Sequence, residues 1–170
     1  MIEPIIGFTV FFLIVFLIIT IGNKSRKKQY NKLLERINGR ILFKKEQTEC
    51  STKTIGLKNN NYLFRHCDIY ITEDSTIIFG YSKNRLIKQL SIPIILTQKT
   101  EQSRKNFPDA IIKEANEITI EKNNLIIEFG EKGIAKTQVF IKLKKLTEVE
   151  QNKLFALIKK TAANSGYTQV

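Results

Sequence analysis

The chain has 170 residues, of which 42% are hydrophobic, and a formal net charge of +12. This length fits one ordinary domain plus short additional segments. Residues 22–45 carry nine Lys and Arg side chains against one Glu, whereas residues 46–170 carry nineteen against fourteen acidic ones. Such a diffuse excess on the domain disfavours nucleic-acid binding, which needs a concentrated basic face.

The first feature along the chain is an apolar run near the N-terminus, Ile5–Ile21, in which fourteen of seventeen residues are Ile, Leu, Val or Phe. As a helix it would reach roughly 26 Å, close to the thickness of about 30 Å of a hydrocarbon core. A signal peptide would begin with Lys or Arg and end at a small-residue cleavage site, and a buried core helix would be shorter. The run therefore predicts a transmembrane anchor over residues 1–23.

The charges on the two sides of the run predict its orientation. Glu3 is the only charged residue before it, and the basic cluster follows it. Lys and Arg gather on the cytoplasmic side of membrane proteins. We therefore expect a single-pass protein of the bacterial inner membrane, with the N-terminus outside and the following domain in the cytoplasm.

Residues 24–38 predict a basic amphipathic helix, because Tyr30, Leu33, Leu34 and Ile37 form one apolar stripe. Two interpretations stay open. The basic side could contact a lipid bilayer and its anionic headgroups, or the stripe could pack on the domain as a connector. The predicted membrane-surface contacts are Lys24, Arg26, Lys27, Lys28, Lys32 and Arg36.

From Arg40 onward the hydrophobic period is two, which is typical of β-strands. We expect a domain over residues 39–162, with a polar loop around one short strand at 47–61. Thr147 and Glu150 form a capping box that begins a C-terminal helix, and residues 163–170 are expected to be a flexible tail. The predicted strands cover residues 40–46, 62–72, 76–82, 85–96, 111–122, 125–130 and 135–144.

The longest polar stretch, residues 97–109, predicts an exposed loop that contains one aromatic residue. Phe107 follows Arg104 and Lys105, so these three residues are candidates for contact with a partner or with a bilayer. The alternative is that Phe107 folds back and anchors the loop, as large apolar side chains commonly do.

This order of elements, together with the hairpin-like stretch Cys67–Tyr81, resembles the pleckstrin-homology-like (PH-like) superfamily, in particular its small bacterial PH and GRAM-like domains. The resemblance covers about residues 39–160. It implies a mainly β, α+β fold, in which a PH-like antiparallel barrel of about six to seven strands and a C-terminal helix follow the two N-terminal helices. The chain lacks the C-terminal Trp and a clear Lys-x-Arg pattern, so inositol-lipid specificity is not expected.

The sequence contains few residues suited to catalysis, and we predict no catalytic, cofactor-binding or metal-binding residues. His66 is the only histidine, and its neighbour Cys67 should point to the opposite face of a strand. Cys50 and Cys67 fit no metal or redox spacing and indicate free thiols in a reducing compartment. Asp68, Glu73 and Asp74 are expected to be solvated turn carboxylates.

The expected function is therefore that of a membrane-anchored interaction module, which is not an enzyme. It would bind an unknown protein or peptide partner, or an anionic lipid surface. One alternative is a membrane-tethered enzyme or enzyme accessory, which a polar pocket around His66, Cys67 and acidic residues would favour. Another alternative is nucleic-acid binding through the basic surface of the domain.

Overall fold

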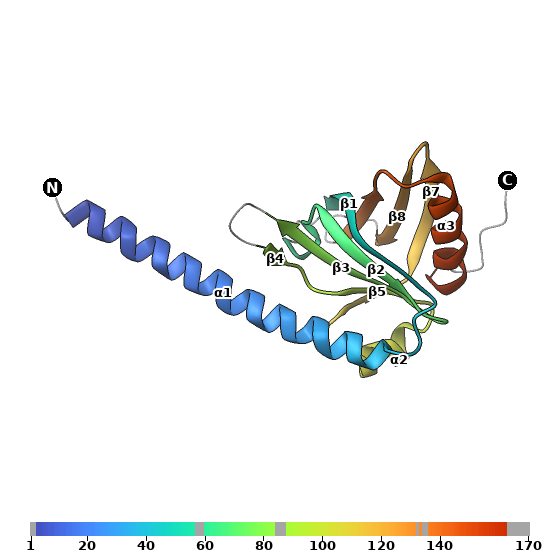
Figure 1. The fold of residues 1–170 in the computed structure, drawn as a ribbon, viewed down its shortest axis with the longest axis horizontal. Coiled ribbons are helices and arrows are strands. Elements are labelled where there is room, and N and C mark those ends of the chain that lie inside the picture. Colours follow the sequence, from blue (N-terminus) through green and yellow to red (C-terminus); the bar gives the residue numbers. More distant parts are fainter. Residues whose placement is uncertain (1–2, 57–59, 84–87, 132, 134–135, 163–170) are drawn as a thin grey trace.

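The computed structural model describes residues 3–56, 60–83, 88–131, 133 and 136–162 (Figure 1). The predicted tail at 163–170 lies outside the described residues. The elements are, in chain order, α1 (Glu3–Ile37), β1 (Phe43–Gly56), the 3₁₀-helix η1 (Asn60–Tyr62), β2 (His66–Ile71), β3 (Thr76–Lys83), β4 (Lys88–Leu90), β5 (Ile94–Leu96), α2 (Thr100–Asn106), β6 (Ile111–Lys113), β7 (Ala115–Glu121), β8 (Asn124–Gly130), β9 (Thr137–Leu143) and α3 (Glu148–Ala162).

The strands form one strongly curved sheet in the order β6-β5-β3-β2-β1-β9-β8-β7, and β4 pairs with β3 beside this path. The long strand β1 takes part in both halves of the sheet. Its first residues pair with β2 and its last residues pair with β9. The two ends of this strand order are β6, which pairs with β5, and β7, which pairs with β8. These two end strands follow each other directly in the chain. The sheet therefore curls into a nearly closed barrel.

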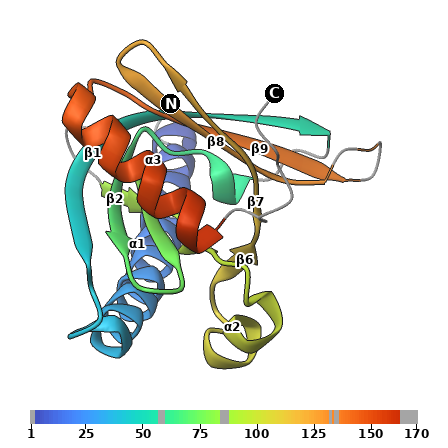
Figure 2. The ribbon, with the colours of Figure 1, turned by 90° about the vertical axis from the view of Figure 1, so that its right-hand side faces the viewer.

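The barrel interior holds the main core, and α3 covers one end of it (Figure 2). Leu125, Ile127 and Phe129 alternate inward along β8, which confirms the predicted period of two. From α3, Leu154 and Ile158 join the same core and are fully buried. The apolar faces of the sheet and of α3 thus cover one another.

The second half of α1 packs on the outer face of the sheet. Leu33 and Ile37 are buried there in a second core that also contains Phe79. The Tyr30 hydroxyl donates a hydrogen bond of 2.7 Å to the carbonyl oxygen of Gly80 in β3. The stripe predicted over 24–38 therefore packs on the domain, as the connector interpretation proposed.

Asn23 of α1 also holds the margin of the sheet. Its side-chain amide donates to the carbonyl oxygen of Lys88 at 2.9 Å and accepts from the backbone N–H of Leu90 at 3.0 Å. One amide side chain thus pairs with two backbone groups of β4, as a neighbouring strand would. This contact connects β4 to the helix.

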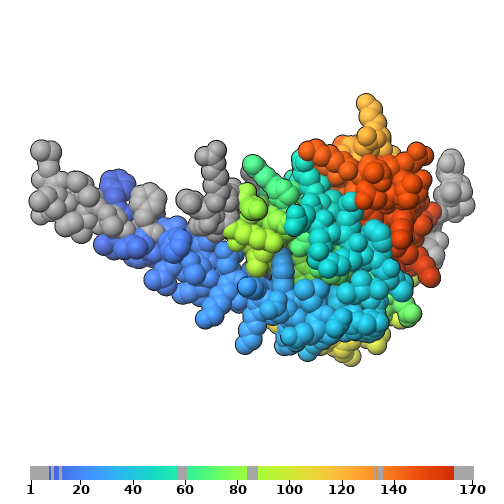
Figure 3. Space-filling model, in the orientation of Figure 1, coloured from blue at the N-terminus to red at the C-terminus, as the bar shows by residue number. Residues whose placement is uncertain are grey.

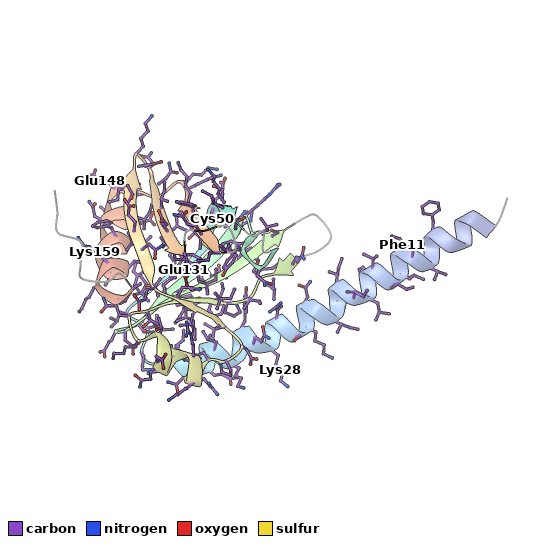
Figure 4. The ribbon with its side chains drawn as sticks, turned by 180° about the vertical axis from the view of Figure 1, so that it is seen from behind. Phe11, Lys28, Cys50, Glu131, Glu148 and Lys159 are labelled. Atoms are coloured by element: carbon purple, nitrogen blue, oxygen red, sulfur yellow. The ribbon has the colours of Figure 1, made fainter. Side chains whose placement is uncertain are left out.

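The first half of α1 extends away from the domain (Figures 1 and 3). Most of its described apolar side chains have exposed fractions between 49% and 66%, whereas Val15 and Ile19 are half-buried. In the view with side chains, Phe11 projects from this part of the helix (Figure 4). The exposed set comprises Phe8, Val10, Phe11, Leu13, Ile14, Phe16, Leu17, Ile18 and Ile21.

In the part of the chain that the structure describes, no helix has both the length and the apolar character required to cross a membrane. This finding contradicts the predicted transmembrane anchor, the single-pass topology and the inner-membrane localisation. The apolar run is instead the first half of one 35-residue helix, α1. The segments predicted as an anchor and as a juxtamembrane helix both belong to α1, which runs without interruption through Gly22.

The predicted elements differ from the observed ones in several respects. β1 continues to Gly56 through a segment predicted as a loop around one short strand, because its second half pairs with β9. The helix α2 lies within the predicted loop 97–109. The described residues form nine strands with one parallel pair, β5 and β6, rather than six to seven antiparallel strands. The fold class is therefore a mixed, nearly closed barrel with helices at both ends.

The predicted capping box is confirmed at the start of α3, and it carries an ion pair. The Thr147 N–H donates to the Glu150 carboxylate at 3.0 Å, and the Glu150 N–H donates to Thr147 Oγ1 at 3.3 Å. Lys45 of β1 bonds the same carboxylate. The hydrogen bond from Lys45, followed by that from Thr147, lowers the pKa of Glu150 below its usual value of 4.5.

We expect the substitution Glu150→Gln to destabilise the domain by less than about 1 kcal/mol at neutral pH, because the pair is partly exposed to solvent. The folded-state pKa is depressed, so this contribution exists above the ordinary pKa and is lost as the pH falls through the folded-state value. Urea unfolding at a series of pH values should show the two proteins converging in acid. Glu148→Gln is the control, since Glu148 has no ion pair in the described residues. A difference that stays constant into acid would contradict the prediction.

Candidate functional site

In β1, a β-bulge with a left-handed residue interrupts the pairing with β2. Lys45 pairs with Ile69 and Thr48 pairs with Cys67, so two residues of β1, Glu46 and Gln47, lie opposite Asp68 alone. Gln47 has a φ of 53°, a left-handed conformation that is rare for a residue with a side chain. Its N–H donates to the Asp68 carboxylate at 2.7 Å.

Two buried side-chain oxygen or nitrogen atoms of the described residues have no hydrogen-bond partner, and both lie next to this bulge: Thr48 Oγ1 and His66 Nδ1. A buried polar atom without a partner costs about 1–3 kcal/mol, and a residue in a left-handed conformation costs a similar amount. Strained backbone and unpaired buried atoms concentrate at functional sites. The bulge is therefore the first place to look for a site.

A polar cavity of about 430 Å³ opens beside the bulge. Its volume lies in the range of roughly 300–1,000 Å³ that ligand sites occupy. Strands β1, β2, β3 and β4 all contribute to it. We call it the bulge cavity, and its lining residues are Glu46, Gln47, His66, Asp68, Tyr81, Lys83 and Lys88.

Stacked rings and a lysine form one part of the cavity lining. The His66 ring stacks on the Tyr81 ring with the centroids 5.6 Å apart. The Lys88 ammonium lies 3.7 Å from the centroid of the Tyr81 ring, a close cation–π contact. Burial, followed by the charge of Asp68, raises the pKa of Tyr81 to about 12, so its hydroxyl stays protonated at neutral pH.

The two carboxylates of the cavity already have partners within the chain. Glu46 accepts hydrogen bonds from the Lys44 ammonium at 2.9 Å and from the Tyr70 hydroxyl at 2.7 Å. The bond from Lys44, followed by that from Tyr70, lowers the pKa of Glu46 and keeps it ionised. Asp68 accepts the Gln47 N–H.

The cations and donors of the cavity have fewer partners. In the described part of the chain, the Lys83 ammonium makes no hydrogen bond or ion pair, and neither does the Tyr81 hydroxyl. His66 Nδ1 also lacks a partner, but this atom is itself buried, so the unpartnered donors that reach the cavity are Lys83 and Tyr81. Donor groups are therefore available for a ligand, whereas the carboxylates are occupied.

Cys67 does not take part in the cavity. It is fully buried in the barrel core next to Cys50, on the face opposite to His66, as the strand alternation predicted. Both cysteines are free, and the hydrogen bond between Cys50 and Cys67, followed by burial, raises the pKa of the Cys67 thiol. The cavity lining contains no Cys, Ser or Thr side chain, and no metal-binding cluster of His, Cys and acidic residues occurs in the described residues.

The predicted membrane-surface residues lie along the middle and second half of α1. Lys24, Lys27, Lys28 and Lys32 are exposed, and Figure 4 labels Lys28 where the helix passes the domain. Arg26 is half-buried and donates to Gln29 at 3.3 Å. Arg36 donates to the carbonyl oxygen of Asn106. Contact with lipid stays a prediction for all six residues.

The predicted partner contacts separate into two kinds. Arg104 and Lys105 are exposed on α2. Phe107 is half-buried against the second core, where the Arg36 guanidinium lies 5.7 Å from the centroid of its ring. The Phe107 side chain thus anchors the segment after α2 on α1. A role for these three residues in binding a partner stays a prediction.

Sequence reasoning identified His66 and Asp68 but did not connect them to the other residues of the cavity. A signal for Tyr81 was present, because His66 and Tyr81 lie on neighbouring strands joined by a short turn. No sequence pattern indicated the bulge, because Glu46 and Gln47 look like ordinary polar residues at the end of a strand. Lys88 reaches the cavity only because β4 pairs with β3.

Comparison with known proteins does not identify a relative that would assign a role to this cavity. The PH-like resemblance of the sequence therefore stays a prediction. No family model, no curated protein and no solved structure matches the chain.

Proposed function

We propose that the chain is a non-enzymatic binding module whose sheet domain holds a small polar ligand in the bulge cavity. The observation that carries this proposal is the combination of a left-handed Gln47 with an adjoining polar cavity of about 430 Å³. A strained bulge persists only when the surrounding structure holds it, and such bulges orient side chains at binding sites.

A binding role is favoured over catalysis because of the chemistry of the lining. A nucleophile and its base must lie within hydrogen-bonding reach. Cys67, the thiol next to His66, lies on the other face of β2. The polar pocket that the enzyme alternative required is thus present around His66 and Asp68, but without the thiol. The protein or lipid partner expected from the sequence stays a prediction.

The test is a ligand titration followed by NMR on the ¹⁵N-labelled full-length chain. Three compounds share a phenyl ring and differ in charge: phenyl phosphate, benzylamine and benzyl alcohol. Binding of at least one of them should shift the backbone amides of Gln47, His66 and Tyr81, whereas those of Gln138 on the far half of the sheet should stay unchanged. Shifts confined to other regions, or no shifts at all, would refute the cavity as a binding site. Release of phenol from phenyl phosphate would refute the non-enzymatic role.

A further inference from the structure

Resting on the proposed function, the geometry points to a specific ligand class: we propose that the bulge cavity binds a water-soluble organic phosphate. The assignment follows from the groups that the cavity leaves available for hydrogen bonding. These groups are the ammonium groups of Lys83 and Lys88, the Tyr81 hydroxyl and the His66 ring. All of them can donate a hydrogen bond.

The carboxylates of the cavity do not favour a cationic ligand. Glu46 is neutralised by Lys44 at 2.9 Å, and its oxygens also accept the Tyr70 hydroxyl. Asp68 is committed to the N–H of Gln47. A cation would have to displace these contacts, whereas an anion would meet two ammonium groups. Charge-assisted hydrogen bonds of that kind are the strongest that a protein offers to a ligand.

The number of donors favours phosphate over carboxylate. Three strands, β2, β3 and β4, contribute four side chains that can donate a hydrogen bond, namely His66, Tyr81, Lys83 and Lys88. A phosphate monoester presents three acceptor oxygens, whereas a carboxylate presents two in one plane. Tyr81 remains a donor at neutral pH, because its hydroxyl stays protonated.

The size and lining of the cavity favour a soluble molecule larger than a free ion. A water molecule takes about 30 Å³ of liquid volume, so a cavity of about 430 Å³ has room for an organic group beside the phosphate. The lining offers two aromatic rings, His66 and Tyr81, and no aliphatic side chain that would hold a lipid tail. An aromatic or sugar-like group next to the phosphate fits these rings.

The experiment measures the affinity of phenyl phosphate by NMR titration or calorimetry on the full-length chain. Phenyl phosphate should bind, and benzylamine and benzyl alcohol should bind at least tenfold more weakly. The variant Lys88→Met keeps the length of the side chain but removes its charge, and it should weaken binding about tenfold or more. Lys53→Met removes the same charge from the exposed end of β1 and should leave the affinity unchanged.

A second variant distinguishes the contribution of the Tyr81 hydroxyl to binding from that of its ring. Tyr81→Phe keeps the ring under Lys88 and removes only the hydroxyl, so we expect a loss of about fivefold. Thermal unfolding of each variant without ligand checks that the fold is retained. Tighter binding of benzylamine or benzyl alcohol at the cavity would overturn the phosphate assignment and leave the proposed function standing. Absence of binding by all three compounds would overturn both. Equal losses in Lys88→Met and Lys53→Met would show a diffuse charge effect and would also overturn the assignment.

Discussion

Replacing Phe79 with alanine is expected to destabilise the domain by about 3–5 kcal/mol, the usual cost of removing a buried phenyl ring from a core. The Phe79 side chain is only 1% exposed. Its ring centroid lies 4.4 Å from that of Tyr30 on α1 and 5.5 Å from that of Tyr70 on β2. The substitution therefore removes the aromatic part of the contact between α1 and the outer face of the sheet.

Urea unfolding gives the change in free energy, and the exposed Leu63→Ala serves as the control. Trypsin provides a second measurement, because release of α1 exposes the backbone after Lys32 and Arg36 to cleavage. Should the alanine variant fail to fold, Phe79→Leu would leave a smaller cavity and still weaken the docking of α1. A loss no larger than that of Leu63→Ala would mean that α1 does not depend on this cluster.

The second large effect is expected for Gly130→Ala, at roughly 3 kcal/mol or more. Gly130 has a φ of +95°, and an added Cβ would lie 2.2 Å from the carbonyl oxygen of Thr137. That oxygen belongs to β9, which pairs with Gly130 through Gln138. A backbone oxygen held in a sheet cannot move away as the end of a side chain can.

The matched control is Gly39→Ala. Gly39 has a similar φ of +83°, but a Cβ there meets no atom within 4 Å. The Gly39→Ala substitution should lower the free energy of unfolding by only about 1–2 kcal/mol, the cost of a left-handed backbone conformation for alanine. The difference between the two variants in urea unfolding therefore measures the steric clash in the sheet. Equal losses would show that β9 shifts to accommodate the methyl group, contrary to this prediction.

The bulge links the fold to the proposed binding role. Without the extra residue, a single residue of β1 would lie opposite Asp68 in a regular ladder, and the hydrogen bond from the left-handed Gln47 to the Asp68 carboxylate would not form. Lys88 is brought to the cavity by the pairing of β4 with β3 and by the contact of Asn23 with β4. The site is thus assembled from segments that are distant in the sequence.

The sequence by itself determined the local features that depend on periodicity and on short-range hydrogen bonds. The apolar run Ile5–Ile21 predicted a helix, and the stripe of Tyr30, Leu33 and Ile37 predicted the face that packs. The alternation in β8 and the capping box of Thr147 and Glu150 were also readable. These patterns hold because each depends on residues within one or two turns or on one strand face.

Only the tertiary structure decided how these elements pair. The second half of β1 is a strand along its whole length because β9 lies beside it, whereas the sequence predicted only one short strand within a polar loop there. The left-handed Gln47 follows from the register of β1 against β2, which no neighbouring residue specifies. The bulge cavity forms because three long-range contacts bring its lining together: the register of β1 against β2, the pairing of β4 with β3, and the packing of α1 on β4. Contacts between residues distant in the chain set these features, and a hydrophobic period reports only which face of an element is buried.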